Sequence, residues 1–278
     1  MPFEPSPPRR PTLWEAWSPW QLALYAVLLL GAYMFWQVVV YDLTNSAFVP
    51  VLAAGLLAVI LPCLGASWWH GQSLVATFDI RAGVGIVLGG LAAGVLAWLP
   101  ASVLAELSSR LRPPGPEYLD FLRDHLPTST TDRIAAFAAV GVMAPVVEEL
   151  VFRGLLYRAA RSRWGVGGAT VITSLFFGIA HWEPWSLFGL VGLGLVMCWL
   201  YERTGSLLAP ILAHGVHNVL SLTIMTRSRD TLGEDRAASP LVLLAAVVSL
   251  VLLVMLVRHL RPGSPGNANP VNSSDDRY

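Results

Sequence analysis

Two adjacent carboxylates, Glu148 and Glu149, lie inside a long apolar stretch of the sequence. Ionisable side chains in a membrane segment are costly and by default mark function. Residues four apart share one face of a helix, so Glu149 can pair with Arg153 while Glu148, turned by about 100°, faces elsewhere. The pattern predicts Glu148 as a general base that activates water for hydrolysis. Glu149 and Arg153 are expected to organise the site, with a purely structural ion pair as an equal alternative.

Two later apolar stretches carry the other groups that could do chemistry. His181 ends one of them, and His214 and Asn218 stand four apart in the other. An Asn amide can donate a hydrogen bond but cannot serve as a general base at neutral pH, so this pair suits a developing oxyanion. His181 could hold or polarise a water beside Glu148. His217 is expected to be structural.

Glu148, His181 and His214 are also an alternative ligand set for a metal. Two His and one carboxylate with an open position form a known catalytic zinc arrangement. The sequence lacks the His-Glu-x-x-His spacing of a helical zinc site, and an intramembrane carboxylate with a bound water suffices chemically. The cofactor is therefore undetermined from the sequence, with none favoured and zinc as the alternative.

The composition predicts a membrane protein. Hydrophobic residues make up 55% of the 278 residues, charged residues only 13%, and mean hydropathy is +0.58, whereas soluble domains carry about 25% charged residues. The net charge of zero gives no electrostatic reason to expect nucleic acid as a partner. The expected partners are membrane lipid and a peptide or protein substrate in the membrane. Cys63 and Cys198 lie in apolar runs and are expected to be packing residues.

About eight apolar segments are long enough to cross a bilayer core, which needs about 20 helical residues. The expected fold is therefore all-α and polytopic, with about eight transmembrane helices enclosing an intramembrane polar cavity. The segments are 20–40, 48–66, 83–104, 134–157, 167–181, 186–201, 207–225 and 241–257. If the fourth helix ends near Arg158, a simple fifth helix would place His181 far from the depth of Glu148. Either helix ends differ from these bounds or the fifth helix starts well outside the bilayer.

The chain is expected to divide into five parts. These are an N-terminal cytoplasmic segment (1–19), N-terminal membrane helices with their connecting loop (20–130), a catalytic membrane core (131–225), the last loop and C-terminal helix (226–261), and a disordered tail (262–278). Arginines favour the expected inside segments by ten to seven, which favours cytoplasmic termini. A bacterial inner membrane is the simplest location.

Two further features concern architecture. Gly85 with Gly89, and Gly90 with Gly94, form small-xxx-small spacings that let a helix pack closely on its neighbours. The link 108–133 predicts a turn and a short amphipathic helix, which could lie on the membrane surface as a lid or substrate guide. A solvated connector is an equal alternative for that link.

Three short motifs in a fixed order carry a family resemblance: Glu148-Glu149-x-x-Phe152-Arg153, Phe177-x-x-x-His181 and His214-x-x-x-Asn218. They resemble the signature of type II CAAX prenyl endopeptidases and their bacterial relatives, the CPBP intramembrane protease family. The motifs cover residues 148–218, and residues 1 to about 130 match no motif of that family.

The resemblance implies an eight-helix membrane fold and peptide-bond hydrolysis inside a membrane cavity. It implies that Glu148 activates water with His181, and that His214 and Asn218 stabilise the tetrahedral oxyanion. It also implies that Glu149 and Arg153 organise the site. Family members are commonly labelled metalloproteases, while a metal-free mechanism with glutamate and histidine is also argued for them; the metal-free mechanism is favoured here.

The leading hypothesis is an intramembrane endopeptidase that acts on a membrane-associated protein or peptide, of which a prenylated CAAX-type substrate is one option. Peptide maturation, bacteriocin processing and self-immunity are equal options for its role. A proton-coupled transporter could use the same ionisable residues as a relay, but the inverted repeats that would favour it are not recognisable. A third alternative is a non-catalytic immunity or scaffold membrane protein of the same fold, which the loss of a motif residue would have favoured.

Overall fold

The computed structural model describes residues 11–44, 46–233 and 238–260. These ranges contain helices and loops and no β-strand, so the all-α prediction is confirmed for them. The predicted tail 262–278 and most of the predicted segment 1–19 lie outside the described residues. The same holds for five of the arginines counted for orientation, namely Arg9, Arg10, Arg236, Arg261 and Arg277.

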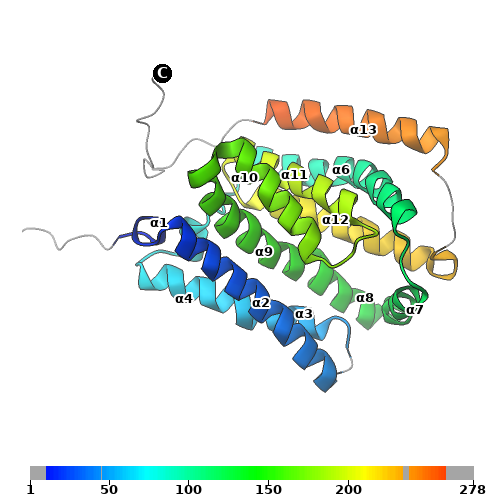
Figure 1. The fold of residues 1–278 in the computed structure, drawn as a ribbon, viewed down its shortest axis with the longest axis horizontal. Coiled ribbons are helices and arrows are strands. Elements are labelled where there is room, and N and C mark those ends of the chain that lie inside the picture. Colours follow the sequence, from blue (N-terminus) through cyan, green and yellow to red (C-terminus); the bar gives the residue numbers. More distant parts are fainter. Residues whose placement is uncertain (1–10, 45, 234–237, 261–278) are drawn as a thin grey trace, which may run out of the picture.

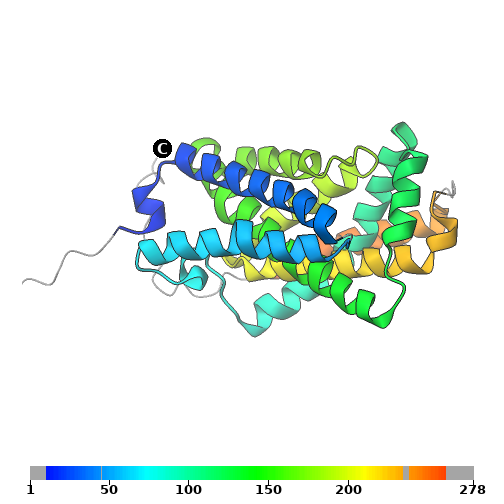
Figure 2. The ribbon, with the colours of Figure 1, turned by 90° about the horizontal axis from the view of Figure 1, so that it is seen from below.

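The long helices run side by side along one direction and form a bundle (Figures 1 and 2). In chain order the elements are α1 (Leu13–Ala16), α2 (Pro19–Thr44), α3 (Val49–Ala54), η1 (Gly55–Ile60), α4 (Leu61–Trp69), α5 (Leu74–Thr77), α6 (Val84–Leu111), α7 (Pro116–His125), α8 (Thr130–Ala136), η2 (Phe137–Met143), α9 (Ala144–Glu149), η3 (Leu150–Tyr157), α10 (Arg158–Ala180), α11 (Leu187–Thr204), α12 (Leu208–Arg227), η4 (Arg229–Thr231) and α13 (Pro240–His259). Elements η1 to η3 are π-helical and η4 is a 3₁₀ turn. Figure 1 places α13 at one edge and α2 with α3 and α4 at the other, so the continuous helix from α8 to η3 lies inside the bundle.

Seven helices in the described ranges are long and apolar enough to cross a membrane, and one of them, Thr130–Ala180, has 51 residues. At 1.5 Å per residue this helix would be about 75 Å long, more than twice the bilayer core of about 30 Å. Gly165 divides it, because its φ of 65° lies in the left-handed region that glycine enters without steric cost. Figure 1 shows the chain reversing there. Divided at this turn, the seven candidate spans of the described residues become eight helical segments, the number predicted from hydropathy.

The position of this turn corrects the expected end of the fourth helix. The helix does not end near Arg158 but continues to Gly165, because no helix breaker intervenes and the Arg158 guanidinium is neutralised by Asp79 at 2.9 Å. The stretches from Glu148 to Gly165 and from Gly165 to His181 are each about 25 Å long. His181 therefore returns to the depth of Glu148, and the expected mismatch between their depths does not arise.

The glycines of α6 set how closely it approaches α12. A Cβ atom on Gly90 would lie 2.7 Å from the Ala209 carbonyl oxygen, and one on Gly94 would collide with the Ala213 carbonyl oxygen. The predicted close packing is confirmed for this pair of glycines. It is wrong for Gly85, whose Cβ would meet no described atom within 4 Å.

A second close approach joins η1 to η2 in a different way. A Cβ atom on Gly55 would lie 2.7 Å from Cγ and 2.8 Å from Sδ of Met143, and 3.0 Å from Cγ2 of Val147. These neighbours are side-chain atoms, and the unbranched Met side chain adapts readily to its surroundings. The contact between α6 and α12, by contrast, is made by backbone.

The predicted short helix in the link 108–133 is confirmed as α7. Tyr118 donates a hydrogen bond to Glu183 at 2.8 Å, and the Tyr41 hydroxyl and the His125 imidazole share one at 2.9 Å. These contacts attach α7 to the loop that follows His181 and to α2. Figure 1 shows α7 at one end of the bundle, and its role as a lid stays a prediction.

We expect Gly94→Ala to lower the free energy of unfolding by about 1–3 kcal/mol, because the added methyl group overpacks the backbone of α12. Alanine is otherwise the better helix former by about 1 kcal/mol. Gly85→Ala is the matched control and should cause no loss. Thermal unfolding of the purified protein in detergent, followed by circular dichroism, measures both, and equal melting temperatures for the two variants would contradict the packing argument.

Candidate active site

Glu148 lies on α9 between two π-helical segments, and its side chain is 16% exposed. Its Oε2 atom is buried and has no hydrogen-bond partner among the described residues. The Nε2 atoms of His181 and His214 each lie 3.7 Å from this oxygen. One carboxylate oxygen is therefore faced by two imidazoles that come from α12 and from the end of α10.

His181 follows the last residue of α10 and is held by that helix. Its Nδ1 lies 2.7 Å from the Phe177 carbonyl oxygen, so Nδ1 carries the hydrogen and donates it. The Phe177 ring is buried and contacts both imidazoles, with centroids 4.6 Å from His181 and 5.7 Å from His214. The His181 Nε2 atom is consequently the one that faces Glu148.

Glu149, Arg153 and His214 form a second, fully enclosed part of the site. Glu149 and Arg153 are 0% exposed and His214 is 3% exposed. Oε1 of Glu149 accepts a hydrogen bond from Nη1 of Arg153 at 2.8 Å and one from Nδ1 of His214 at 3.0 Å. Arg153 also donates through Nη2 to the Gly194 carbonyl oxygen at 3.0 Å, and its guanidinium lies 4.7 Å above the Phe177 ring. The expected Glu149 and Arg153 pair is present, and it also orients His214.

Asn218 lies one helical turn after His214 and binds a carbonyl that the neighbouring helix leaves free. Its Nδ2 donates to the Val140 carbonyl oxygen at 3.0 Å. In a regular α-helix that oxygen would accept from Ala144, but the π-helical turn directs the Ala144 N–H to Ala139, and Pro145 has no N–H. Asn218 therefore completes the hydrogen bonding of η2, and its second amide hydrogen has no assigned acceptor.

The arrangement can move protons. Both imidazoles donate through Nδ1, so each Nε2 can accept a proton or, when the ring is charged, donate one. A distance of 3.7 Å is too long for a direct hydrogen bond, and such separations often contain a bridging water. A water beside Glu148 would meet one carboxylate and two imidazoles, which is the combination that general acid–base chemistry needs.

The donor set of Glu148, His181 and His214 has the chemistry of a zinc site, but its placement does not fit one. The described residues contain no group of three or more His, Cys, Asp or Glu side chains that could hold a metal ion. We therefore derive no step through a metal.

Three contributors to the site gave no sequence signal. The Val140 and Gly194 carbonyls are backbone groups, which every residue carries. Tyr33 lies in the apolar run of α2, where it is buried and interacts electrostatically with Glu148. The buried Nδ1 of His217 has no hydrogen-bond partner in the described part of the chain, and its ring interacts electrostatically with His214.

Residues 130–220 match the family model described as "Type II CAAX prenyl endopeptidase Rce1-like". This confirms the family resemblance for the segment that carries the three motifs and all six candidate site residues. The matched segment is about a third of the chain. No solved structure matches the chain.

Relatives from three bacteria align with parts of the chain. An Escherichia coli protein, "Uncharacterized 24.3 kDa protein", is 35% identical over 34% of this chain and 46% of its own length. The Bacillus subtilis protein "Putative membrane peptidase YdiL" is 31% identical over 28% of this chain and 32% of its own length. A Lactococcus lactis protein, "UPF0177 protein YaiF", is 29% identical over 30% of this chain and 38% of its own length. The chain thus spans less than half the length of each of these relatives.

Removing the cation of the buried Glu149–Arg153 ion pair should lower the free energy of unfolding far more than removing the cation of an exposed pair. We expect Arg153→Met to lower the free energy of unfolding by about 3–5 kcal/mol, because it leaves the Glu149 carboxylate buried without its cation. Arg161→Met, which removes a half-exposed partner of Glu202, should cost about 1 kcal/mol or less. Chemical unfolding in detergent measures both.

The double variant Arg153→Met/Glu149→Leu separates charge from packing. It should recover part of the lost stability, because no uncompensated charge remains. A double variant less stable than Arg153→Met would show that the charge balance of this pair is not what the fold depends on.

Proposed function

We propose that this protein is an intramembrane endopeptidase in which Glu148 activates a water molecule to hydrolyse a peptide bond of a membrane-associated protein or peptide. The observation that carries the proposal is the Oε2 atom of Glu148, which is buried, lacks a hydrogen-bond partner among the described residues and faces two imidazole Nε2 atoms at 3.7 Å. The family match of residues 130–220 supports the same reaction class.

In the proposed reaction the water lies between Glu148 and His181. Glu148 takes one proton from the water while the water oxygen bonds to the carbonyl carbon of the substrate, giving a tetrahedral intermediate. The C–N bond then breaks, and the proton held by Glu148 passes to the leaving nitrogen. The products are a new amine and a new carboxylic acid, and Glu148 is again a carboxylate. No cofactor enters the balance.

The developing oxyanion needs hydrogen-bond donors that are already in place. We assign this role to Nε2–H of His214 and to the second amide hydrogen of Asn218. Glu149 accepts from Nδ1 of His214, so Nε2 is a donor in the form of the ring that carries both protons. Asn218 is fixed by the Val140 carbonyl. Glu149 and Arg153 thus act by positioning His214.

The location of the site supports a substrate within the membrane. Its residues lie on helices that meet the length and hydropathy of membrane spans. We propose an intramembrane polar cavity around Glu148 that admits the scissile bond, with a prenylated CAAX-type protein as one substrate option. Membrane lipid is the second expected partner.

The arginines of the whole sequence support an orientation, since they favour the expected inside segments by ten to seven. Among the described residues the two ends of the bundle carry six arginines each, and the end at which α2 begins has only three carboxylates, Glu15, Asp79 and Glu202. We propose that this end is cytoplasmic and that the membrane is a bacterial inner membrane.

Glu148→Gln tests the general base. It preserves the shape of the side chain and removes its capacity to accept a proton, so cleavage of a substrate peptide in proteoliposomes should fall about 10²-fold or more. Glu202→Gln is the matched control, since this carboxylate lies on α11 outside the site, and it should leave the rate unchanged. Cleavage at the parental rate by Glu148→Gln would rule out the proposed base.

The same proteoliposomes test the transport alternative. A proton relay through these residues would dissipate an imposed pH gradient, and the parent should not do so faster than protein-free vesicles. Gradient loss that depends on Glu148, without peptide cleavage, would favour a transporter over a peptidase.

Metal removal tests the assignment of the reaction to side chains alone. Because the described donor set does not fit a metal, dialysis against a chelator should leave the cleavage rate unchanged, with the zinc content measured on the same sample. One equivalent of zinc lost together with activity, and both restored by added zinc, would overturn the metal-free mechanism.

A further inference from the structure

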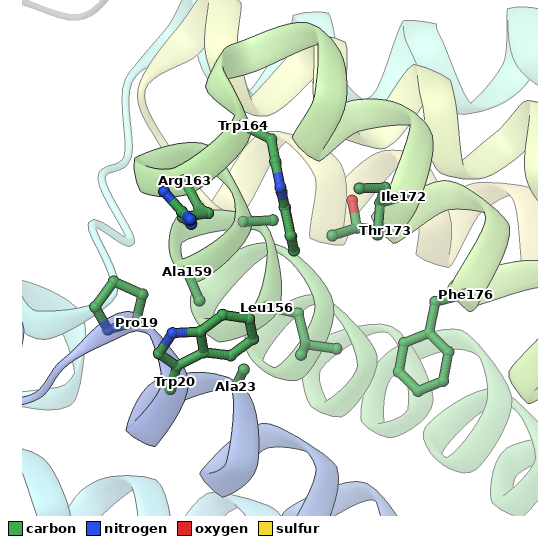
Figure 3. A pocket seen from close by; sticks show the side chains of 11 residues that line it. Pro19, Trp20, Ala23, Leu156, Ala159, Arg163, Trp164, Ile172, Thr173 and Phe176 are labelled. Atoms are coloured by element: carbon green, nitrogen blue, oxygen red, sulfur yellow. The ribbon is translucent and has the colours of Figure 1, made fainter.

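An apolar cavity lies at the end of the bundle where α2 begins, apart from the catalytic cluster (Figure 3). Its volume is about 150 Å³, and it is bordered by α2, the end of η3 and both arms of α10. Figure 3 shows the Trp164 ring on one side and Trp20 with Leu156 on the other, while Arg163 and Phe176 lie towards opposite ends. None of the six candidate site residues lines it.

The walls of the cavity suit hydrocarbon. Small side chains at Ala23, Ala159 and Ala160 leave the space, and the large residues around it are mainly apolar. A dry apolar cavity of this volume takes up a group of roughly six carbons, the size of benzene. Because α2 and the helix Thr130–Ala180 are long and apolar enough to cross a membrane, we place the acyl region of the bilayer, next to its headgroups, beside this cavity.

The mouth of the cavity suits an anion. Arg163 lines the cavity and is exposed, and its guanidinium has no ion-pair or hydrogen-bond partner among the described residues. Arg161, two residues earlier, is instead paired with Glu202 at 2.9 Å. A guanidinium matches the geometry of a phosphate group and binds it through two parallel hydrogen bonds.

The surroundings place this mouth at headgroup level. The Trp20 and Trp164 rings meet edge to face with centroids 6.5 Å apart, and tryptophan concentrates where headgroups meet acyl chains. The excess of arginine over carboxylate at this end attracts anionic lipids in addition.

We propose that this cavity binds one anionic phospholipid, with the phosphate on Arg163 and part of one acyl chain in the cavity that Trp20, Trp164 and Leu156 line. Binding at this site requires both the phosphate group and the acyl chain of the ligand. A soluble phosphate has no chain for the apolar walls, and a zwitterionic lipid carries a second, positive group beside its phosphate. The proposal is independent of the peptidase activity, because it uses none of the residues assigned to that reaction.

The test measures lipid retention by the full-length protein in detergent, using native mass spectrometry with phosphatidylglycerol, phosphatidylcholine or inorganic phosphate. The parent should bind one phosphatidylglycerol about fivefold more tightly than phosphatidylcholine, as expected for one charge contact at a membrane surface. Arg163→Gln should remove that preference, and Arg163→Lys should keep most of it. Arg161→Gln, which changes the net charge equally on the same helix, should leave the preference intact.

A cavity-filling variant tests the chain half of the site. Ala159→Leu should weaken retention of both phospholipids, and its melting temperature without added lipid shows whether it folds. If Ala159→Leu does not fold, Arg163→Gln still decides the test, because it changes only an exposed side chain. Equal binding of the two phospholipids by the parent would overturn the proposal. So would loss of the preference in Arg161→Gln, which indicates diffuse surface charge, or displacement of the lipid by inorganic phosphate.

Discussion

The constraint on which the rest of this structure depends is the presence of charge where water is excluded. Glu149 and Arg153 are completely buried, and an isolated charge in such surroundings is unstable by several kcal/mol. A network of hydrogen bonds offsets this destabilisation. One carboxylate oxygen of Glu149 accepts from both Arg153 and His214, and Arg153 also donates to the Gly194 carbonyl of α11. Three membrane helices are thereby held at one point. The network also leaves Glu148 as the neighbouring carboxylate that is not neutralised by an arginine.

The turn at Gly165 serves the same site from a distance. By carrying the helix well past its apolar part before reversing, the chain makes the outward and return arms nearly equal in length. His181 therefore arrives opposite Glu148, although the two residues stand on different crossings. The position of one catalytic candidate depends on a glycine about 25 Å away along the helix axis.

Hydropathy was enough to predict the eight helical segments, and the four-residue spacings were enough to predict which side chains share a helical face. The end of the fourth crossing could not be predicted in this way, because hydropathy falls at Arg158 whereas the helix ends only at Gly165. The partner of Asn218 was equally hidden. It arises from a π-helical turn and Pro145 acting together on a backbone carbonyl, and no residue type signals that combination. Gly85 shows the reverse error, since its spacing matches a packing motif while its surroundings are open.

The two close approaches around the site differ in stiffness. Where α6 meets α12, Gly94 faces the backbone of Ala213, the residue before His214, so the two helices cannot slide without a collision. Where η1 meets η2, Gly55 faces the flexible Met143 side chain, which can change rotamer and let the helices part. The site thus has one rigid wall that carries His214 and one compliant wall near Glu148. Any breathing motion large enough to admit a polypeptide is easier on the compliant side, and it would leave the geometry of the histidine undisturbed.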